Sequence, residues 1–150
     1  MEQLNRLIFG LTAGRKYATF FYGVYDPVSG LIQYANAGHI PPLLVRGGAI
    51  QELPSTGLPI GLFPASRLQV GEARLEPGDS LLLVTDGILE AGNPMTDDFG
   101  ETRWTELAAT LGGLPAEQAM AMIFDAVLTF EGTTPPSDDK TVVVLCRAAL

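Results

Sequence analysis

Apolar residues near the start of the chain recur at the spacing of a helix. Four leucine and isoleucine side chains within residues 3–11 follow the order i, i+3, i+4, i+7. Glycine commonly follows the last turn of a helix, so this helix should end near Gly14. The pattern therefore predicts a short helix ahead of the first strand.

Two strand pairs are predicted next. Residues 17–25 are rich in aromatic side chains and residues 31–37 form a second β-like run, with the turn signal Asp-Pro-Val-Ser-Gly between them. Residues 43–45 and 50–53 are joined by a glycine-rich turn and should form a second antiparallel pair. The first half of the chain is therefore expected to be mainly β.

A loop and two further strands follow. Residues 54–66 are dense in proline and glycine but carry several large apolar side chains, so we expect an ordered surface loop with those side chains buried. Residues 67–75 alternate polar and apolar positions, which predicts a strand with one solvated face. Residues 81–84 are wholly apolar and predict a buried strand.

Two helices and a last strand complete the pattern. Helices are expected over residues 102–111 and 115–130, with Trp104 packing the first one down. The second carries one apolar stripe, which consists of Ala119, Met122, Ile123, Ala126, Val127 and Phe130. Residues 141–146 are apolar and predict a strand at the centre of a sheet.

Composition narrows the class of protein. A chain of 150 residues with 47% hydrophobic and 17% charged residues is typical of one globular domain. The net charge of −8 argues against nucleic acid or an anionic membrane surface as the main partner. We find no signal peptide and no apolar run long enough to span a membrane, and the single Cys146 suits an inert, buried thiol in a reducing cytoplasm.

Asp86 is the first candidate for chemistry. It directly follows the buried strand at residues 81–84, and a carboxylate at the rim of a rigid sheet is well held for binding a hard cation. The alternative is a structural role, because Asp-Gly is a common turn pair and aspartate commonly caps a helix. The motif by itself favours the structural role, with the ligand role as the alternative.

Other candidates lie at the last strand and in two loops. Asp138 and Asp139 precede the strand at residues 141–146, and on a regular strand only one of them could face a given site. Asp97 and Asp98 could add to a cation site or form a solvated acidic loop. His39 could be a general acid or a metal ligand, but no acidic or hydroxyl partner adjoins it, which favours a histidine that pins a loop.

Two strands thus each carry aspartate at one end. Two carboxylates brought together are the minimum for a magnesium or manganese site completed by water. Residue patterns alone therefore predict an α+β domain and allow an acidic cation site within it.

Four motifs in order extend this interpretation. They are AGHIPP at residues 37–42, LEPGDSLLLVTDGILEA at 75–91, FGETR at 99–103 and DDKTVVVL at 138–145. Together they resemble the metal-dependent protein phosphatases of the bacterial sporulation-stage-II-E type, within the PPM family. The resemblance covers nearly the whole chain from about Tyr17 onward.

The resemblance implies a fold, an activity and partners. The fold would be a PPM-like β-sandwich flanked by helices. The activity would be removal of phosphate from serine or threonine with two Mn²⁺ or Mg²⁺ ions, by direct attack of water and without a covalent enzyme intermediate. Asp86 and Asp138 would be metal ligands, with Asp139 the weaker candidate and His39 structural. The substrate would be a phosphorylated anti-anti-sigma (STAS) protein in a partner-switching pathway, with a sensor domain upstream.

One departure from the family pattern matters. The chain lacks the early metal aspartate and the G-D-V-S-G-H-G-like turn of the family, so residues 1–150 resemble the C-terminal two-thirds of one domain, without its N-terminal strands. We therefore expect the chain alone to be inactive, to bind Mg²⁺ weakly, and to self-associate as a homo-oligomer through exposed sheet edges. The alternative is a non-catalytic binding module that has lost the metal centre.

Overall fold

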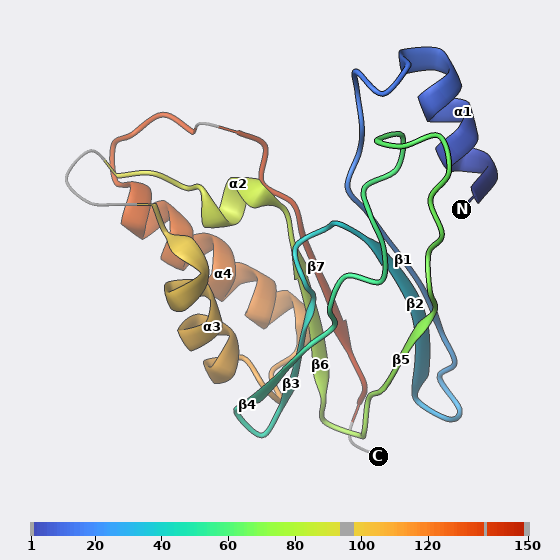
Figure 1. Cartoon of the computed structure of the whole chain (residues 1–150). Coiled ribbons are helices and arrows are strands. Elements are labelled where there is room, and N and C mark those ends of the chain that lie inside the picture. Colours follow the sequence, from blue (N-terminus) through green and yellow to red (C-terminus); the bar gives the residue numbers. More distant parts are fainter. Residues whose placement is uncertain (1, 94–97, 137, 149–150) are drawn as a thin grey trace. The chain divides into compact units, whose positions relative to one another are not determined.

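The computed structural model describes residues 2–93, 98–136 and 138–148 (Figure 1). Its helices are α1 (Glu2–Thr12), α2 (Asp86–Leu89), α3 (Gly100–Thr110) and α4 (Ala116–Glu131). Its strands are β1 (Phe20–Tyr25), β2 (Leu31–Ala37), β3 (Leu43–Arg46), β4 (Ala49–Glu52), β5 (Gly71–Arg74), β6 (Ser80–Val84) and β7 (Val142–Cys146). No helix of the described part is long and apolar enough to cross a membrane.

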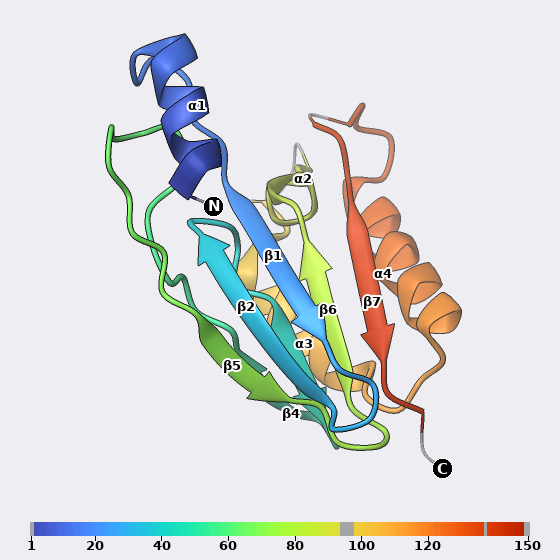
Figure 2. The ribbon, with the colours of Figure 1, turned by 90° about the vertical axis from the view of Figure 1, so that its right-hand side faces the viewer.

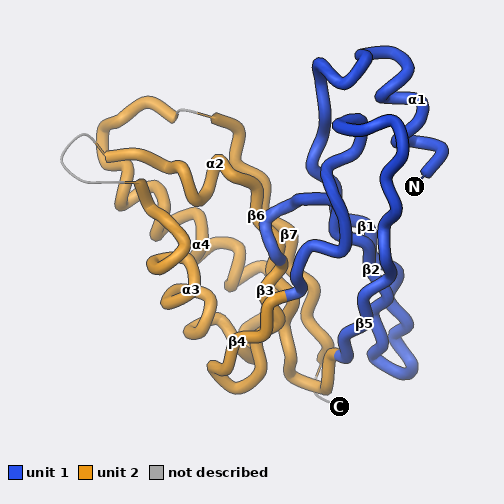
Figure 3. Tube along the Cα trace, viewed as in Figure 1, with its two compact units in different colours: residues 1–41, 53–74 blue, residues 42–52, 75–150 orange. Residues whose placement is uncertain are grey.

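The chain divides into two compact units (Figure 3). Unit 1 comprises Met1–Pro41 and Leu53–Arg74, and unit 2 comprises Pro42–Glu52 and Leu75–Leu150. Each unit contains one antiparallel sheet. All candidate aspartates lie in unit 2, whereas His39 lies in unit 1.

Unit 1 is built on a three-stranded sheet in the order β1-β2-β5. The predicted hairpin of β1 and β2 is confirmed, with Tyr25 opposite Ile32 beside the turn. The carboxylate of Asp26 organises that turn by accepting hydrogen bonds from the backbone N–H of Val28 at 2.9 Å and the hydroxyl of Ser29 at 2.6 Å. Strands β1 and β5 are shorter than the patterns predicted.

The predicted first helix is confirmed as α1, but its apolar face is only partly buried. Leu7 is 58% and Leu11 76% exposed, whereas Asn5 is 1% exposed. The Asn5 amide donates to the carbonyl of Phe63 at 3.1 Å and accepts from the N–H of Gly61 at 2.8 Å. Hydrogen bonds of the Asn5 side chain, and not apolar packing alone, therefore hold α1 against the loop at residues 54–66.

The loop at residues 54–66 buries fewer side chains than expected. Ile60 is buried, but Leu58 is 53% and Phe63 is 48% exposed. Ile60 is held because its backbone exchanges two hydrogen bonds with Ala18, each 2.9 Å long. The expectation that all large apolar side chains of this loop are buried was therefore wrong for Leu58 and Phe63.

Unit 2 is built on a four-stranded sheet in the order β4-β3-β6-β7. Strand β6 runs antiparallel to both neighbours (Figure 2). It is buried along most of its length. The predicted pairing of β3 with β4 is confirmed. The prediction that the last strand is central was wrong, because within the described residues β7 pairs only with β6.

Helices α3 and α4 cover one face of the unit 2 sheet (Figure 1). The fully buried side chains of α4 recur at the spacing of one helix face: Ala119, Ile123 and Val127. Met122 is 38% exposed, so its placement in the core stripe was wrong. Trp104 of α3 is 3% exposed and packs in the core as predicted, although its indole N–H has no hydrogen-bond partner among the described residues.

Candidate metal site

The β6–β7 pairing continues one residue beyond the two strands. The regular register ends where Val84 lies opposite Val142. The next residue, Thr85, donates its backbone N–H to the carbonyl of Thr141 at 3.1 Å. The Thr85 hydroxyl accepts the backbone N–H of Thr141 at 3.0 Å, so a side chain takes the place of a main-chain carbonyl.

The same hydroxyl reaches the acidic turn before β7. It donates to the carbonyl oxygen of Asp139 at 3.4 Å. Gly87 packs against that carbonyl so closely that any side chain at position 87 would overlap it. The structure therefore brings Thr85-Asp86-Gly87 into direct backbone contact with Asp138-Asp139.

The two predicted ligand side chains are exposed and held locally. Asp86 Oδ1 accepts the N–H of Gly87 at 3.0 Å, and Asp138 Oδ1 accepts the N–H of Asp139 at 2.7 Å. Among the described residues, no hydrogen bond engages Oδ2 of either carboxylate. Each carboxylate thus has one oriented oxygen and one oxygen available to a ligand.

Asp139 contributes its backbone rather than its side chain to this contact. Residues 138–141 lie before β7, so the alternation of side chains along a strand does not govern Asp138 and Asp139. The Asp139 side chain is exposed, while its carbonyl oxygen meets Thr85 and Gly87. The choice of Asp138 over Asp139 as a metal ligand stays a prediction, because both side chains are exposed.

The site offers the donor chemistry of a hard divalent cation, but only part of a ligand set. Carboxylate oxygens suit Mg²⁺ and Mn²⁺. Within the described ranges, no three histidine, cysteine, aspartate or glutamate side chains lie close enough together to hold a metal ion. Asp97, a weaker candidate, lies outside the described residues, and the Asp98 side chain is exposed. Among the described residues, the predicted ligand set is therefore limited to the carboxylates of Asp86 and Asp138.

His39 has the hydrogen bonds of a loop anchor. Its backbone N–H donates to Oδ1 of the buried Asn36 at 2.8 Å, and its Nδ1 lies 2.9 Å from the carbonyl of Ile40. The Asn36 amide in turn donates to the carbonyl of Leu53 at 3.4 Å. These contacts agree with the interpretation of His39 as a histidine that pins a loop.

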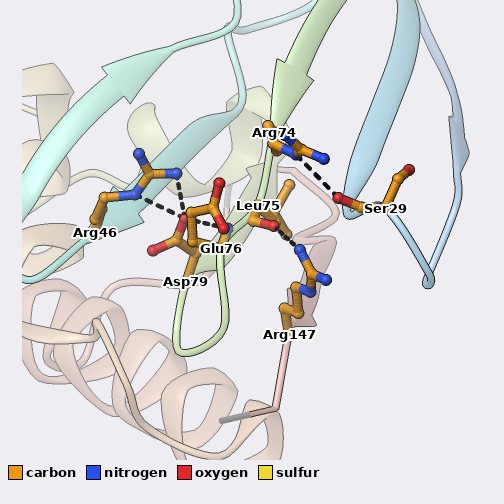
Figure 4. A network of polar contacts seen from close by, with 7 residues as sticks. All are labelled: Ser29, Arg46, Arg74, Leu75, Glu76, Asp79 and Arg147. Carbon is orange, nitrogen blue, oxygen red and sulfur yellow. Dashed lines mark hydrogen bonds and ion pairs between the residues drawn. The ribbon is translucent and has the colours of Figure 1, made fainter. Parts of the chain in front are cut away.

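A buried aspartate at the far end of β6 was missed by sequence reasoning (Figure 4). Asp79 is 3% exposed and its Oδ2 accepts Arg46 Nη2 at 2.6 Å, Arg46 Nε at 2.9 Å and the N–H of Glu76 at 2.7 Å. The Asp79 carboxylate, chiefly through this hydrogen bonding, raises the pKa of Arg46. The Pro-Gly-Asp sequence that ends at Asp79 indicated a turn, but a turn signal does not show that the Asp79 carboxylate is buried.

Cys146 is half-buried rather than fully buried. Its Sγ lies 3.4 Å from both the Ser80 hydroxyl and the Leu114 carbonyl. Cys146 therefore belongs to the packing between β6, β7 and the residues before α4.

Three related proteins align with this chain over different portions of its length. Phosphoserine phosphatase RsbU of Bacillus subtilis is 27% identical over 98% of this chain and 44% of its own length. Phosphoserine phosphatase RsbP of the same organism is 33% identical over 60% of this chain and 24% of its length. Protein IcfG of Synechocystis is 36% identical over 60% of this chain and 14% of its length. The chain thus spans less than half of each of these relatives.

Solved structures show the same fold. The RsbU and RsbW domains of a Mycobacterium tuberculosis protein match with a TM-score of 0.72 at 28% identity, over 97% of this chain and 40% of that one. The phosphatase domain of SpoIIE from Bacillus subtilis, presoaked with Mn, matches with a TM-score of 0.71 at 21% identity, over 97% of this chain and 65% of that one. The predicted α+β fold of helices and two antiparallel sheets is therefore confirmed.

The family assignment rests on a match that covers nearly the whole chain. The sequence profile of the family described as Stage II sporulation protein E (SpoIIE) matches residues 1–148. Its named relatives above include phosphatases, and its solved neighbours include phosphatase domains. The chain belongs to the Stage II sporulation protein E (SpoIIE) family.

Proposed function

We propose that this chain carries part of the metal centre of a PPM-type phosphatase that removes phosphate from serine or threonine of a regulatory protein. The observation that supports the proposal is the Thr85–Thr141 hydrogen bond, which ties the residue before Asp86 to the residue before β7, three positions after Asp138 in the sequence. The activity, the substrate and the partners are those of the whole protein to which this domain contributes.

In this proposal Asp86 and Asp138 bind a divalent cation, Mn²⁺ or Mg²⁺, through their carboxylate oxygens. The bound ion supplies charge neutralisation at the phosphoryl oxygens and lowers the pKa of water. In this proposal, the other residues of the chain position the two carboxylates. Thr85 and Gly87 set the distance between the two acidic turns, and the local N–H donors orient each carboxylate.

The proposed substrate is a phosphorylated anti-anti-sigma (STAS) protein in cytoplasmic partner-switching signalling. Two relatives are named phosphoserine phosphatases, which supports a phosphoserine substrate. The net charge of −8 disfavours a nucleic-acid partner. A sensor domain upstream would control the activity.

Residues 1–150 constitute part of a phosphatase domain in this proposal, and we expect them to be inactive alone. Two carboxylates hold an octahedral ion weakly, because Mg²⁺ dehydrates reluctantly and needs further oxygen ligands. The test is hydrolysis of an aryl phosphate by the 150-residue chain with Mn²⁺, with EDTA and Asp86→Asn as controls. Robust turnover that EDTA and Asp86→Asn both abolish would contradict the inactivity but support the phosphatase assignment.

A second candidate is a non-catalytic binding module. It is favoured by the absence, among the described residues, of a third metal-binding side chain near Asp86. Mn²⁺ titration separates the two candidates. Binding that Asp86→Asn removes supports the metal centre, whereas partner binding with no Mn²⁺ effect at Asp86 supports the module.

A further inference from the structure

A buried ion pair lies next to the acidic turn of unit 2. Lys140 Nζ is 2.8 Å from Glu131 Oε1, and the two side chains are 9% and 3% exposed. Lysine and glutamate are rarely so deeply buried, and burying them is unfavourable unless they pair. Within the described residues Glu131 Oε1 accepts no hydrogen bond, so the contact with Lys140 acts mainly through charge.

The position of the pair connects it to the candidate metal site. Glu131 is the last residue of α4, and Lys140 directly follows Asp138 and Asp139. The next residue, Thr141, is held by the Thr85 hydroxyl. The ion pair therefore joins the two ends of the segment that carries the acidic turn.

The direction of the Lys140 side chain has an electrostatic consequence. An ammonium group this near in sequence to Asp138 and Asp139 could pair with them and compete with a divalent cation for their oxygens. In the described structure it pairs with Glu131, and neither Asp138 nor Asp139 forms an ion pair. Both aspartates remain exposed.

We propose that Glu131 is a positioning residue that draws Lys140 away from Asp138 and Asp139 and so keeps their carboxylates available to the metal ion. This inference rests on the proposed function, since it assigns a purpose to the pair only if Asp86 and Asp138 bind metal. Glu131 itself does not touch the ion. Its effect passes through Lys140, and removal of such outer partners weakens metal binding about tenfold or more in other sites.

The test compares three forms of the full chain: wild type, Glu131→Gln, and Glu131→Gln combined with Lys140→Met. Mn²⁺ is titrated, and paramagnetic broadening of the Asp86 and Gly87 amide signals gives its dissociation constant. We expect binding about tenfold weaker in Glu131→Gln, and within about twofold of wild type in the double variant. Unchanged binding in the single variant, or equally weak binding in the double variant, would overturn the inference.

Two controls separate this inference from stability and from the proposed function. Arg46→Met breaks the ion pair with Asp79 at the other end of β6, roughly 20 Å away by strand rise, and should leave Mn²⁺ binding unchanged. In the metal-free protein, the carboxyl carbon shifts of Asp138 and Asp139 should change in Glu131→Gln and return in the double variant. If wild type shows no Mn²⁺ broadening at Asp86, the proposed function fails. The carboxyl carbon shifts of Asp138 and Asp139 would still show whether Lys140 pairs with Glu131 or with these two aspartates.

Discussion

The side-chain hydroxyl of Thr85 accepts the backbone N–H of Thr141 at 3.0 Å, where a regular antiparallel ladder would use a main-chain carbonyl. Because the hydroxyl accepts this N–H, the Thr85 carbonyl can accept the N–H of Ile88, at 3.0 Å, where the chain turns into α2. One hydroxyl therefore lets the chain leave the sheet at Asp86 while remaining tied to β7.

Thr85→Val removes this hydroxyl at nearly constant volume. We expect a loss of about 1 kcal/mol in the free energy of unfolding, because the Thr141 N–H loses its partner. We also expect weaker Mn²⁺ binding at Asp86, because the two acidic turns are no longer tied. Thr85→Ser keeps the hydroxyl and is the matched control for urea unfolding and Mn²⁺ titration. Equal Mn²⁺ affinity in the valine and serine variants would show that the hydroxyl does not position the site.

Gly87→Ala tests the close approach of α2 to the acidic turn. Alanine normally stabilises a helix interior relative to glycine by about 0.5–1 kcal/mol. At position 87 the added methyl group would overlap the carbonyl oxygen of Asp139, so we expect destabilisation by about 1–3 kcal/mol instead.

Gly10→Ala is the control for that substitution, because position 10 lies within α1 and, apart from its chain neighbours and the nearby backbone of α1, no described atom lies within 4 Å of the added methyl group. It should raise the melting temperature, whereas Gly87→Ala should lower it. Shifts of the same sign in thermal unfolding would show that the backbone contact at Gly87 is not tight.

Residue patterns were sufficient for most elements because apolar periodicity reports which face of an element is buried. Strand β2 matches its predicted range, and the β3–β4 pair formed as expected. Apolar periodicity does not show how many strands pair with a given strand. The apolar run of β7 predicted a central strand, but helix α4 covers it and only β6 pairs with it among the described residues.

The candidate site was only half visible in the sequence. The sequence pattern pointed to Asp86 after one apolar strand and to Asp138 and Asp139 before another, and the family resemblance then singled out Asp138. The parts that hold them, the Thr85 hydroxyl and the Glu131–Lys140 pair, join segments whose contact depends on the β6–β7 register and on the packing of α4. No local spacing encodes those contacts, so only the folded chain reveals them.

Asp79 and Asp86 stand at the two ends of β6, and the same substitution should destabilise the fold at Asp79 much more than at Asp86. Asp79→Asn weakens a buried carboxylate that accepts three hydrogen bonds, so we expect a loss of about 2–3 kcal/mol in the free energy of unfolding. Asp86→Asn alters an exposed side chain and should change stability by less than about 0.5 kcal/mol. Urea denaturation measures both, and comparable losses would contradict the division between a structural and a ligand aspartate.

His39→Ala distinguishes a loop anchor from a catalytic or metal-binding histidine. Loss of the Nδ1 contact with the Ile40 carbonyl should lower the free energy of unfolding by about 1 kcal/mol. Mn²⁺ binding measured at Asp86 should not change. A Mn²⁺ affinity that falls while stability is preserved would assign His39 to the metal site instead.

Self-association is expected from the free edge of the unit 2 sheet. Within the described residues β7 pairs only with β6, so its outer edge offers unpaired backbone groups, and Val143 on this strand is 51% exposed. Such an edge pairs readily with a second copy unless a charge blocks it. Val143→Lys places a cation on the edge strand and should shift the chain toward monomer, as measured by light scattering across a concentration series. Val28→Lys is the control, because Val28 is 86% exposed but lies in the β1–β2 turn. A monomeric wild-type chain, or equal dissociation by both variants, would show that this edge does not drive association.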